Sequence, residues 1–433
     1  MYQIFKGFSF NIIDIIKLQD QVFKINVVRV MLVHFFIYLV LPFQSIYMIN
    51  LGLSPIQLGW VTGFAGIIGG IFSFISAQRI SVTFSLKTFF LITTLSIGLG
   101  SMILSIANNS ILAALGAGVF IFSWYSMMHL CGSVCGLCLN NDIRVTAMQT
   151  CDMLASIPKL LAPALGSFLA ITFSRNHDMT TGIPLLYLIS TLGFFIIFIL
   201  LLKYFSNPSS LCTDSVVQMK YKNDRYFRKN VRDLLSQKNG INIKCLLLTL
   251  ILIQIPWFIM NIYMPLFAQQ VKNADTLTIG FMQSAFWACT LLLAIPAGSI
   301  ADKIGRKSSL TIFLSIAIFS LILLILSKTQ QMLIVSGFLQ GFTFLSLVTS
   351  SGMSIEAVPK TSLIKWLGFQ GLLKGLMAQL GPAMGGTLWG VYGPYSLIYL
   401  IIGFYIIAIV LLRTLPETKE GILNYSSESL SAC

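Results

Sequence analysis

The amino-acid sequence predicts an all-α membrane protein with twelve transmembrane helices. Of its 433 residues, 56% are hydrophobic and only 10% are charged, and the mean hydropathy is +0.86. In an ordinary soluble domain about a quarter of the residues are charged. The chain also contains a series of apolar stretches long enough to cross a bilayer core of about 30 Å, which takes roughly 20 helical residues.

The apolar stretches form two sets of six. The first set lies near 31–50, 56–78, 88–107, 111–138, 146–172 and 182–203, and the second near 244–268, 277–300, 308–327, 331–353, 364–391 and 394–413. The interval between the sets is polar and strongly basic. We therefore expect a cytoplasmic N-terminal segment (1–30), a six-helix bundle (31–203), a cytoplasmic linker (204–243), a second six-helix bundle (244–413) and a cytoplasmic tail (414–433).

The distribution of basic residues predicts the orientation. If both termini are cytoplasmic, all but five of the 28 lysines and arginines fall on the cytoplasmic side, as the positive-inside rule requires. The formal net charge of +14 then reflects topology, because the basic residues are dispersed between apolar runs and form no solvated face for a nucleic acid. The opening residues resemble no cleavable leader. We expect a multi-pass protein of the inner membrane.

Matching features recur in the two halves. Leu41-Pro42-Phe43 in the first stretch corresponds to Met264-Pro265-Leu266 in the seventh. Ala162-Pro163-Ala164-Leu165-Gly166 in the fifth corresponds to Gly381-Pro382-Ala383-Met384-Gly385 in the eleventh. Membrane proteins built from two related bundles leave such traces. The sequence therefore predicts two pseudo-symmetric six-helix bundles.

A specific motif follows the eighth stretch. It reads Gly298-Ser-Ile-Ala-Asp302-Lys303-Ile-Gly305-Arg306-Lys307 and resembles the signature G-x-x-x-D-R/K-x-G-R-R/K of the major facilitator superfamily. The resemblance covers residues 30–420 in helix number and repeat pattern. It implies that family's fold and secondary active transport by alternating access, in which this motif acts as a gate.

Physical reasons can be given for the residue types in the motif. We expect Gly298 to permit close approach of helices and Gly305 to permit a tight turn. Arg306 and Lys307, together with Lys303, should anchor the cytoplasmic face. Asp302 should pair with these cations or with the N-terminal dipole of a neighbouring helix.

The first copy of the motif, expected after the second stretch, is degenerate. Of Ser76-Ala-Gln78-Arg79-Ile-Ser81, only Arg79 corresponds to the signature, and Gln78 stands in the acidic position. Drug-efflux branches of the family keep this copy and an arginine where the chain has Leu112. The chain therefore departs from a standard multidrug antiporter.

Three ionisable residues fall within the apolar stretches: Asp152, Lys159 and Lys374. Such residues are costly in a membrane and usually face a cavity. By family analogy, the stretches of the two lysines flank a central cavity from opposite halves. Two cations there predict a small organic anion or zwitterion as the substrate. The alternative is that a lysine snorkels or pairs locally.

Asp152 and His129 are the candidates for proton coupling. A buried carboxylate or imidazole can exchange a proton as a cavity opens, and structural hydrogen bonding is the alternative. The candidate substrate-binding residues besides the lysines are Gln44, Tyr47, Tyr125, Trp257, Asn261 and Gln340. His34, Tyr38, Trp124, Gln254, Tyr263 and Thr349 complete the expected cavity, although tyrosine and tryptophan at helix ends also form interfacial belts.

Other functions are possible on the sequence alone. One alternative is efflux of amphipathic drugs or metabolites by proton antiport, and another is a sugar-type porter, since Pro416-Glu-Thr-Lys419 resembles the tail of sugar porters. An enzyme is not expected, because paired carboxylates and nucleophile–base motifs are missing. Cys131, Cys135 and Cys138 have a spacing used for iron–sulfur ligation, but they end a membrane helix with a small-residue packing face. We expect no metal or other cofactor, a monomer, and a small solute, H⁺ and lipid as partners.

Overall fold

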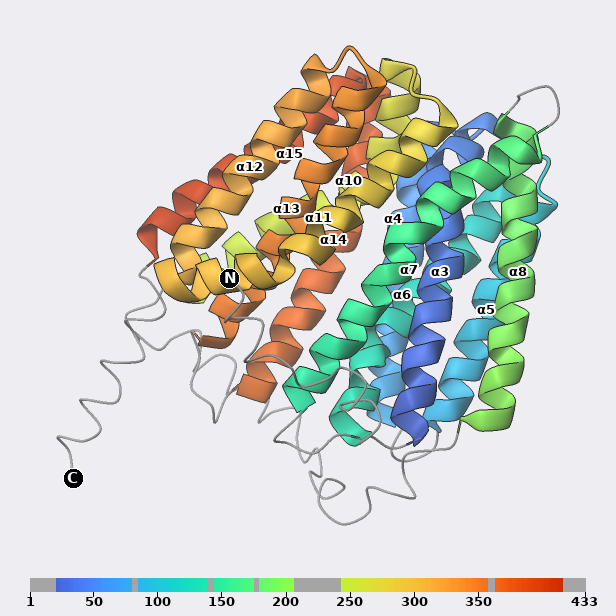
Figure 1. Ribbon diagram of the computed structural model, residues 1–433, viewed down its shortest axis with the longest axis horizontal. Helices are drawn as coiled ribbons and strands as arrows, with labels where there is room; N and C mark the ends of the chain where they lie inside the picture. Colours follow the sequence, from blue (N-terminus) through green and yellow to red (C-terminus); the bar gives the residue numbers. More distant parts are fainter. Residues whose placement is uncertain are drawn as a thin grey trace. The chain divides into compact units, whose positions relative to one another are not determined.

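The computed structural model describes residues 21–79, 85–138, 144–174, 179–205, 243–356 and 363–415. Within these ranges the chain forms twelve helices and no strand (Figure 1). Their bounds are α3 Gln21–Asn50, α4 Pro55–Arg79, α5 Leu86–Ser105, α6 Ser110–Cys138, α7 Arg144–Thr172, α8 Met179–Tyr204, α10 Ile243–Lys272, α11 Thr276–Ile304, α12 Arg306–Leu326, α13 Gln330–Glu356, α14 Leu363–Tyr392 and α15 Pro394–Thr414.

The helices have the dimensions of membrane spans. Among the described residues, eleven are long and apolar enough to cross a bilayer by length and composition. The twelfth helix is α14, in which several side chains lie outside the described residues. A helix satisfies its own backbone hydrogen bonds, which is why apolar segments in lipid adopt this form. The prediction of an all-α protein with twelve helices is confirmed.

Local sequence explains where several helices begin. Ser54 and Gln57 form a capping box at the start of α4, since the Gln57 amide donates to Ser54 Oγ at 3.2 Å and the Ser54 amide donates to Gln57 Oε1 at 2.9 Å. Asp275 caps α11 by accepting from the Thr278 amide at 2.8 Å. These caps close the short turns that connect α3 to α4 and α10 to α11.

The chain divides into two compact units. The first unit contains residues 1–41 and 68–220, and the second contains residues 42–67 and 221–433. A division at the linker alone would place 42–67 with the first half, whereas the contacts group this segment with the second. It comprises the end of α3 and the start of α4, so both helices pass from one unit to the other.

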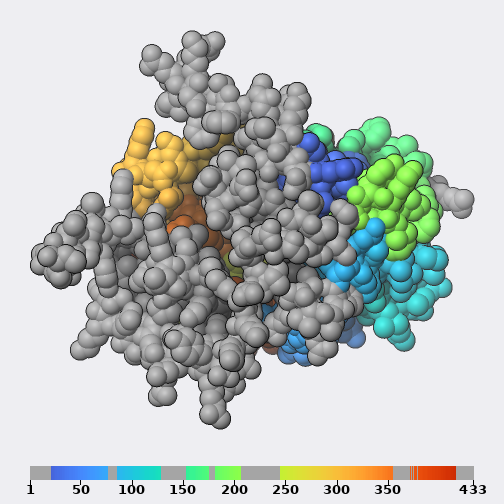
Figure 2. Space-filling model, turned by 90° about the horizontal axis from the view of Figure 1, so that it is seen from below, coloured from blue at the N-terminus to red at the C-terminus, as the bar shows by residue number. Residues whose placement is uncertain are grey.

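The two units repeat one packing scheme. In the first unit α5 packs against α6 and α8, and in the second unit α12 packs against α13 and α15. Figure 2 shows the start of α5 beside the end of α8 at one face of the first unit. Residues 111–126 of α6 and 331–346 of α13 show the same succession of buried, half-buried and exposed side chains. This repetition explains the matching features of the two sequence halves.

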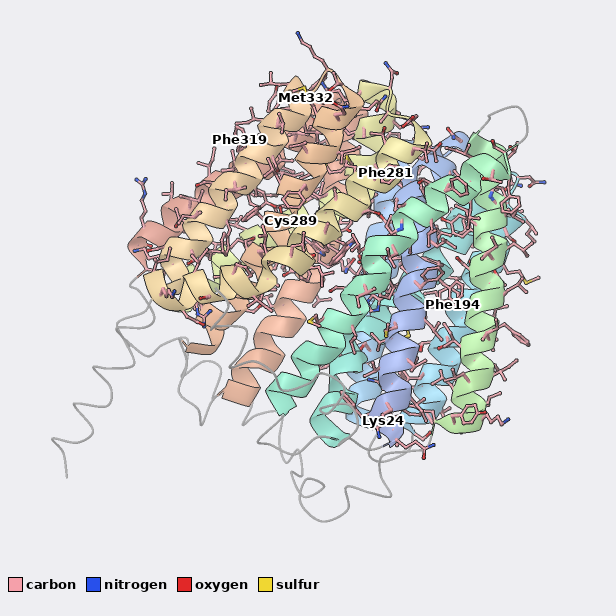
Figure 3. The ribbon with its side chains drawn as sticks, viewed as in Figure 1. Lys24, Phe194, Phe281, Cys289, Phe319 and Met332 are labelled. Carbon is pink, nitrogen blue, oxygen red and sulfur yellow. The ribbon has the colours of Figure 1, made fainter. Side chains whose placement is uncertain are left out.

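The outward faces of the helices are apolar. On α8 the exposed side chains include Leu188, Leu192, Phe195 and Ile199, and on α12 they include Ile312, Phe319 and Leu326; Phe319 is labelled in Figure 3. Large exposed hydrophobic side chains on many helices would be unfavourable in water. They suit contact with lipid, in keeping with a multi-pass membrane protein.

Candidate functional site

A group of ring side chains lies on α3 and α6 of the first unit. The imidazole of half-buried His34 stacks with Tyr38 at a centroid distance of 6.1 Å. Tyr38 meets Trp124 edge to face at 6.3 Å, and Trp124 stacks on Tyr125 at 5.2 Å. His34 Nδ1 donates to the Val30 carbonyl oxygen at 2.7 Å, so Nε2 is the ring nitrogen left for other partners. Four residues predicted to line a cavity thus lie together.

Two cations act on this group. His34 lies within electrostatic range of Lys159 on α7 and of Arg29 on its own helix. Lys159 is half-buried and follows the buried Pro158. The predicted substrate-binding residues Lys159 and Tyr125 are therefore brought to one neighbourhood of the first unit. We call Arg29, His34 and Lys159 the basic cluster.

Sequence reasoning missed Arg29, because it placed residues 1–30 outside the membrane helices. In the structure α3 begins at Gln21, and Arg29 is only 1% exposed. Its Nη2 and Nε donate to Asn26 Oδ1 at 2.8 and 3.1 Å, and its guanidinium lies 3.9 Å from the centroid of the Phe90 ring. These contacts accommodate the charge inside the unit. Asn26, one helical turn before Arg29, was the signal available in the sequence.

Some predicted site residues lie outside the described side chains. Lys374 falls within α14, Asp152 within α7, His129 within α6, and Arg79 ends α4, but the structure describes only their backbone. The side chains of Cys131, Cys135 and Cys138 are likewise outside the described set. The roles predicted for these residues stay predictions.

One face of α10 in the second unit carries polar and aromatic residues. Gln254, Trp257 and Asn261 are half-buried, and their spacing places them on the same side of the helix. The Asn261 Nδ2 group donates to the Trp257 carbonyl oxygen at 2.8 Å. Trp257 and Asn261 were predicted to bind substrate, and the structure places them together on this face.

Other predicted residues are buried among helices of the second unit. Gln340 is 3% exposed, and its amide donates to Ser336 Oγ at 3.1 Å within α13. Gln44 and Tyr47, near the end of α3, are 5% and 2% exposed. Among the described residues Gln44 Nε2 has no hydrogen-bond partner.

Tyr263, expected in the cavity, instead joins α4 to α14 within the second unit. Its hydroxyl lies 3.1 Å from the carbonyl oxygens of both Pro55 and Pro382. Nearby, a Cβ added at Gly59 would lie 2.3 Å from the Pro382 oxygen, and one at Gly63 would lie 2.8 Å from the Gln379 oxygen. The start of α4 therefore packs backbone to backbone against α14. We call this contact the glycine seam.

The structure tests part of the reasoning about the motif at 298–307. Gly305 has φ of +97° and forms the turn between α11 and α12, as expected. Asp302 pairs with Arg306 at 2.8 Å within the motif itself. The packing role expected for Gly298 stays a prediction: the residue is half-buried on α11, and among the described residues no atom lies within 4 Å of a Cβ built there.

Lys307 anchors the end of the last helix. Its Nζ donates to the carbonyl oxygens of Leu415 at 2.6 Å and Arg413 at 3.2 Å. In the first unit Lys87, also the second residue of its helix, donates to the Leu202 carbonyl oxygen at 2.8 Å. Aligning the starts of α5 and α12 therefore matches Lys87 with Lys307. The first motif copy retains this lysine, which comparison of the two sequences alone did not recognise: that comparison kept only Arg79, in the position of Lys303.

Comparisons with known proteins indicate the class of protein to which the fold and the site correspond. Residues 246–429 match the model of the Major Facilitator Superfamily. A stretch of 150 residues, 34% of the chain, is 27% identical to the tetracycline resistance protein, class H, of Pasteurella multocida. That match spans only 37% of the relative's own length.

Solved structures share the whole fold. The nucleoside transporter NupG has a TM-score of 0.69 at 13% identity, over 90% of this chain and 97% of its own. A D-xylose-proton symporter has a TM-score of 0.68 at 14% identity, over 92% and 98%. A bacterial homolog of the human lysosomal transporter Spinster, inward-facing and occupied, has a TM-score of 0.68 at 13% identity, over 91% and 95%.

Twelve described helices in repeated packing, eleven of them long and apolar enough to cross a bilayer, together with this likeness to membrane transporters, define a multi-pass membrane protein with a transporter fold. The chain resembles the Major Facilitator Superfamily over residues 246–429, which are less than half of its length. The three solved structures are of transporters rather than enzymes, in agreement with the prediction from the sequence. Their cargoes differ from one another, so the matches do not assign a subfamily.

Proposed function

We propose that the chain is a secondary active transporter that moves a small organic anion or zwitterion across the inner membrane by alternating access, coupled to protons. The observation that carries the proposal is the basic cluster of the first unit. His34 lies within range of the charges of both Lys159 and Arg29. Ionisable groups at membrane depth are costly and commonly mark a substrate path.

The chemistry of the cluster suits an anion. Arg29 is held by Asn26 and Phe90, so it contributes a fixed positive charge rather than a mobile ligand. Lys159 is half-buried on α7 and carries a flexible ammonium group. An anion that replaces water near both charges gains Coulombic energy that water would screen more strongly. We assign direct binding to Lys159 and long-range attraction to Arg29.

The remaining predictions complete this proposal. Lys374 supplies a second cation, and Asp152 and His129 exchange the coupling proton. Both termini and the linker 204–243 are cytoplasmic. The protein acts as a monomer, in which the bundles 31–203 and 244–413 carry out the alternating access. The motif at 298–307 acts in gating. Support for these parts comes from the sequence pattern and from the family.

Flux into proteoliposomes tests the proposal. The purified chain is reconstituted, a pH gradient is imposed, and uptake of labelled lactate, succinate and benzoate is compared with that of glucose. We expect at least one anion to be transported, and Lys159→Gln to raise its apparent KM about tenfold, the loss of one charge-assisted bond. Lys203→Gln is the matched control, because Lys203 is an exposed lysine at the end of α8. Anion flux with an unchanged KM in Lys159→Gln would contradict the assignment.

Efflux of an amphipathic compound is a second candidate. The identity of 27% with part of a tetracycline resistance protein favours it. If it is correct, expression of the chain in a sensitive bacterium raises the tetracycline concentration needed to stop growth, and collapse of the proton gradient abolishes the effect. Unchanged sensitivity, with the chain present in the membrane, would leave the anion transporter as the better description.

A further inference from the structure

Four aromatic side chains meet in the second unit. Trp257 on α10 lies 5.4 Å from Phe286, 6.1 Å from Trp287 and 5.4 Å from Phe344, measured between ring centroids. Trp287 lies 5.2 Å from Phe286 and 5.3 Å from Phe344. The rings come from α10, α11 and α13, and all pairs are tilted or edge to face, the favourable geometries for aromatic contacts. We call these four residues the aromatic platform.

The platform has a buried base and an accessible edge. Trp287 and Phe286 are 1% and 6% exposed and form the base. Trp257 and Phe344 are half-buried and form the edge. A side chain such as Trp287 is explained by packing alone, whereas two large rings that keep part of their surface open can contact a ligand.

The open edge lies on a polar face rather than on a lipid-facing one. Between residues 249 and 268, no side chain of α10 is exposed, although α12 and α15 expose many apolar side chains. The half-buried face of α10 that bears Trp257 also bears Gln254 and Asn261. Asn261 already uses its Nδ2 donor on the Trp257 carbonyl, so its Oδ1 is the group suited to a ligand's N–H or O–H. Amides at membrane depth belong on a path for polar solutes.

The repeat shows how the two units differ at this place. The shift that superposes residues 111–126 on 331–346 places Trp124 opposite Phe344. The correspondence of Pro42 with Pro265 places His34 opposite Trp257 and Tyr38 opposite Asn261. Both units therefore carry ring side chains here, but an imidazole within range of two cations stands in the first unit where Trp257 stands in the second.

We propose that the aromatic platform binds a planar ring of the transported solute, so that the substrate class is a small solute carrying an aromatic or heteroaromatic ring. Trp257 and Phe344 contact the ring faces, and Gln254 and Asn261 hydrogen-bond to its polar substituents. Transport of this ligand rests on the proposed function, but ring binding by the platform does not. Stacking on one ring contributes about 1 kcal/mol beyond burial of area, equivalent to roughly a fivefold change in Kd.

Calorimetry with matched probes tests the platform. The full chain in lipid nanodiscs is titrated with 2-naphthoate, with its saturated counterpart decahydro-2-naphthoate and with neutral 2-naphthol, and empty nanodiscs serve as the blank. We expect 2-naphthoate to bind about fivefold or more tightly than the saturated acid. Trp257→Leu should remove this preference and weaken 2-naphthol equally. Trp257→Phe should retain most of it, because it keeps a ring.

Two further variants keep the outcome decisive. Phe319→Leu is the control, since Phe319 is an aromatic residue 57% exposed on the outer face of α12. Phe344→Leu removes the other edge ring and replaces Trp257→Leu if that variant does not fold. Equal binding of the aromatic and saturated acids, or a preference that survives both edge variants, overturns the platform. Binding that depends on Trp257 but not on Lys159 supports the platform and refutes the assignment of anion binding to Lys159. Binding that depends on Lys159 but not on Trp257 or Phe344 supports the anion assignment and refutes the platform.

Discussion

Lys87 and Lys307 perform the same structural task in the two halves of the chain. Each is the second residue of its helix, and each donates to carbonyl groups at the end of the last helix of its half, at Leu202 and at Leu415. The last carbonyls of a helix have no partner within it and carry the negative end of the helix dipole. A lysine placed there supplies both hydrogen bonds and opposite charge.

Replacement of either lysine should therefore reduce stability. Lys307→Met and Lys87→Met are each expected to lower the free energy of unfolding by about 1 kcal/mol, the worth of a hydrogen bond to a charged group near a helix end. Thermal unfolding in detergent measures the change. Lys303→Met is the control, because Lys303 is exposed in the same motif. A control that loses as much stability as Lys307→Met would refute the anchoring role.

Asp302 should matter to function more than to folding. Its side chain is 67% exposed, and its ion pair with Arg306 spans the turn between α11 and α12. Such surface pairs contribute about 0.5 kcal/mol or less. We expect Asp302→Asn to unfold within about two degrees of the parent chain and to lose most of its flux in proteoliposomes. If the variant unfolds much earlier, Asp302 is a structural residue and the gating proposal loses this support.

The glycine seam predicts a sharp contrast between glycines. Gly59→Ala places a methyl group against the Pro382 backbone oxygen, which cannot move aside as a side chain can. We expect a loss of about 1–3 kcal/mol, typical of overpacking. Gly298→Ala, where the added Cβ meets no described atom, should be neutral or slightly stabilising because alanine favours a helix. Chemical unfolding of both variants provides the comparison, and equal effects would show that the seam is not tightly packed.

Gly66 offers a rescue experiment at the same seam. A Cβ there would lie 2.0 Å from Gln379 Oε1, the end of a flexible side chain. That amide is 2% exposed and lacks partners among the described residues. Gly66→Ala should cost about 1 kcal/mol, and Gln379→Ala in the same chain should restore most of the loss. Thermal unfolding of the two single variants and the double variant measures the coupling. Independent, additive effects would show that the two residues do not touch.

Tyr263 is expected to hold the seam through its hydroxyl. Tyr263→Phe keeps the ring contact with Trp389 at 5.7 Å but removes the group that reaches the Pro55 and Pro382 carbonyls. We expect a loss of about 1 kcal/mol in the free energy of unfolding. Tyr399→Phe is the matched control, because Tyr399 is 60% exposed on α15. A stability unchanged from the parent would show that water replaces the hydroxyl without cost.

The helix count and the membrane location follow directly from composition and periodicity. In a bilayer, an apolar run of about 20 residues forms a helix, because no water is present to hydrogen-bond to its backbone N–H and C=O groups. Gly305 could be assigned to a turn for a similar local reason, since its spacing within the motif requires a change of direction. The basic residues that flank the apolar runs add a predicted orientation.

Roles that depend on a distant partner were decided by tertiary packing. Arg29 looked like the last residue of a polar tail, but Phe90 on another helix accommodates its charge within the unit. Gly59 and Gly298 are indistinguishable as residues, yet within the described part of the chain only Gly59 lies against another backbone, at Pro382. Tyr263 likewise points at two carbonyls far away in the chain rather than at a cavity. Hydropathy averages over neighbours in sequence, whereas the environment of a side chain is set by which helix lies against it.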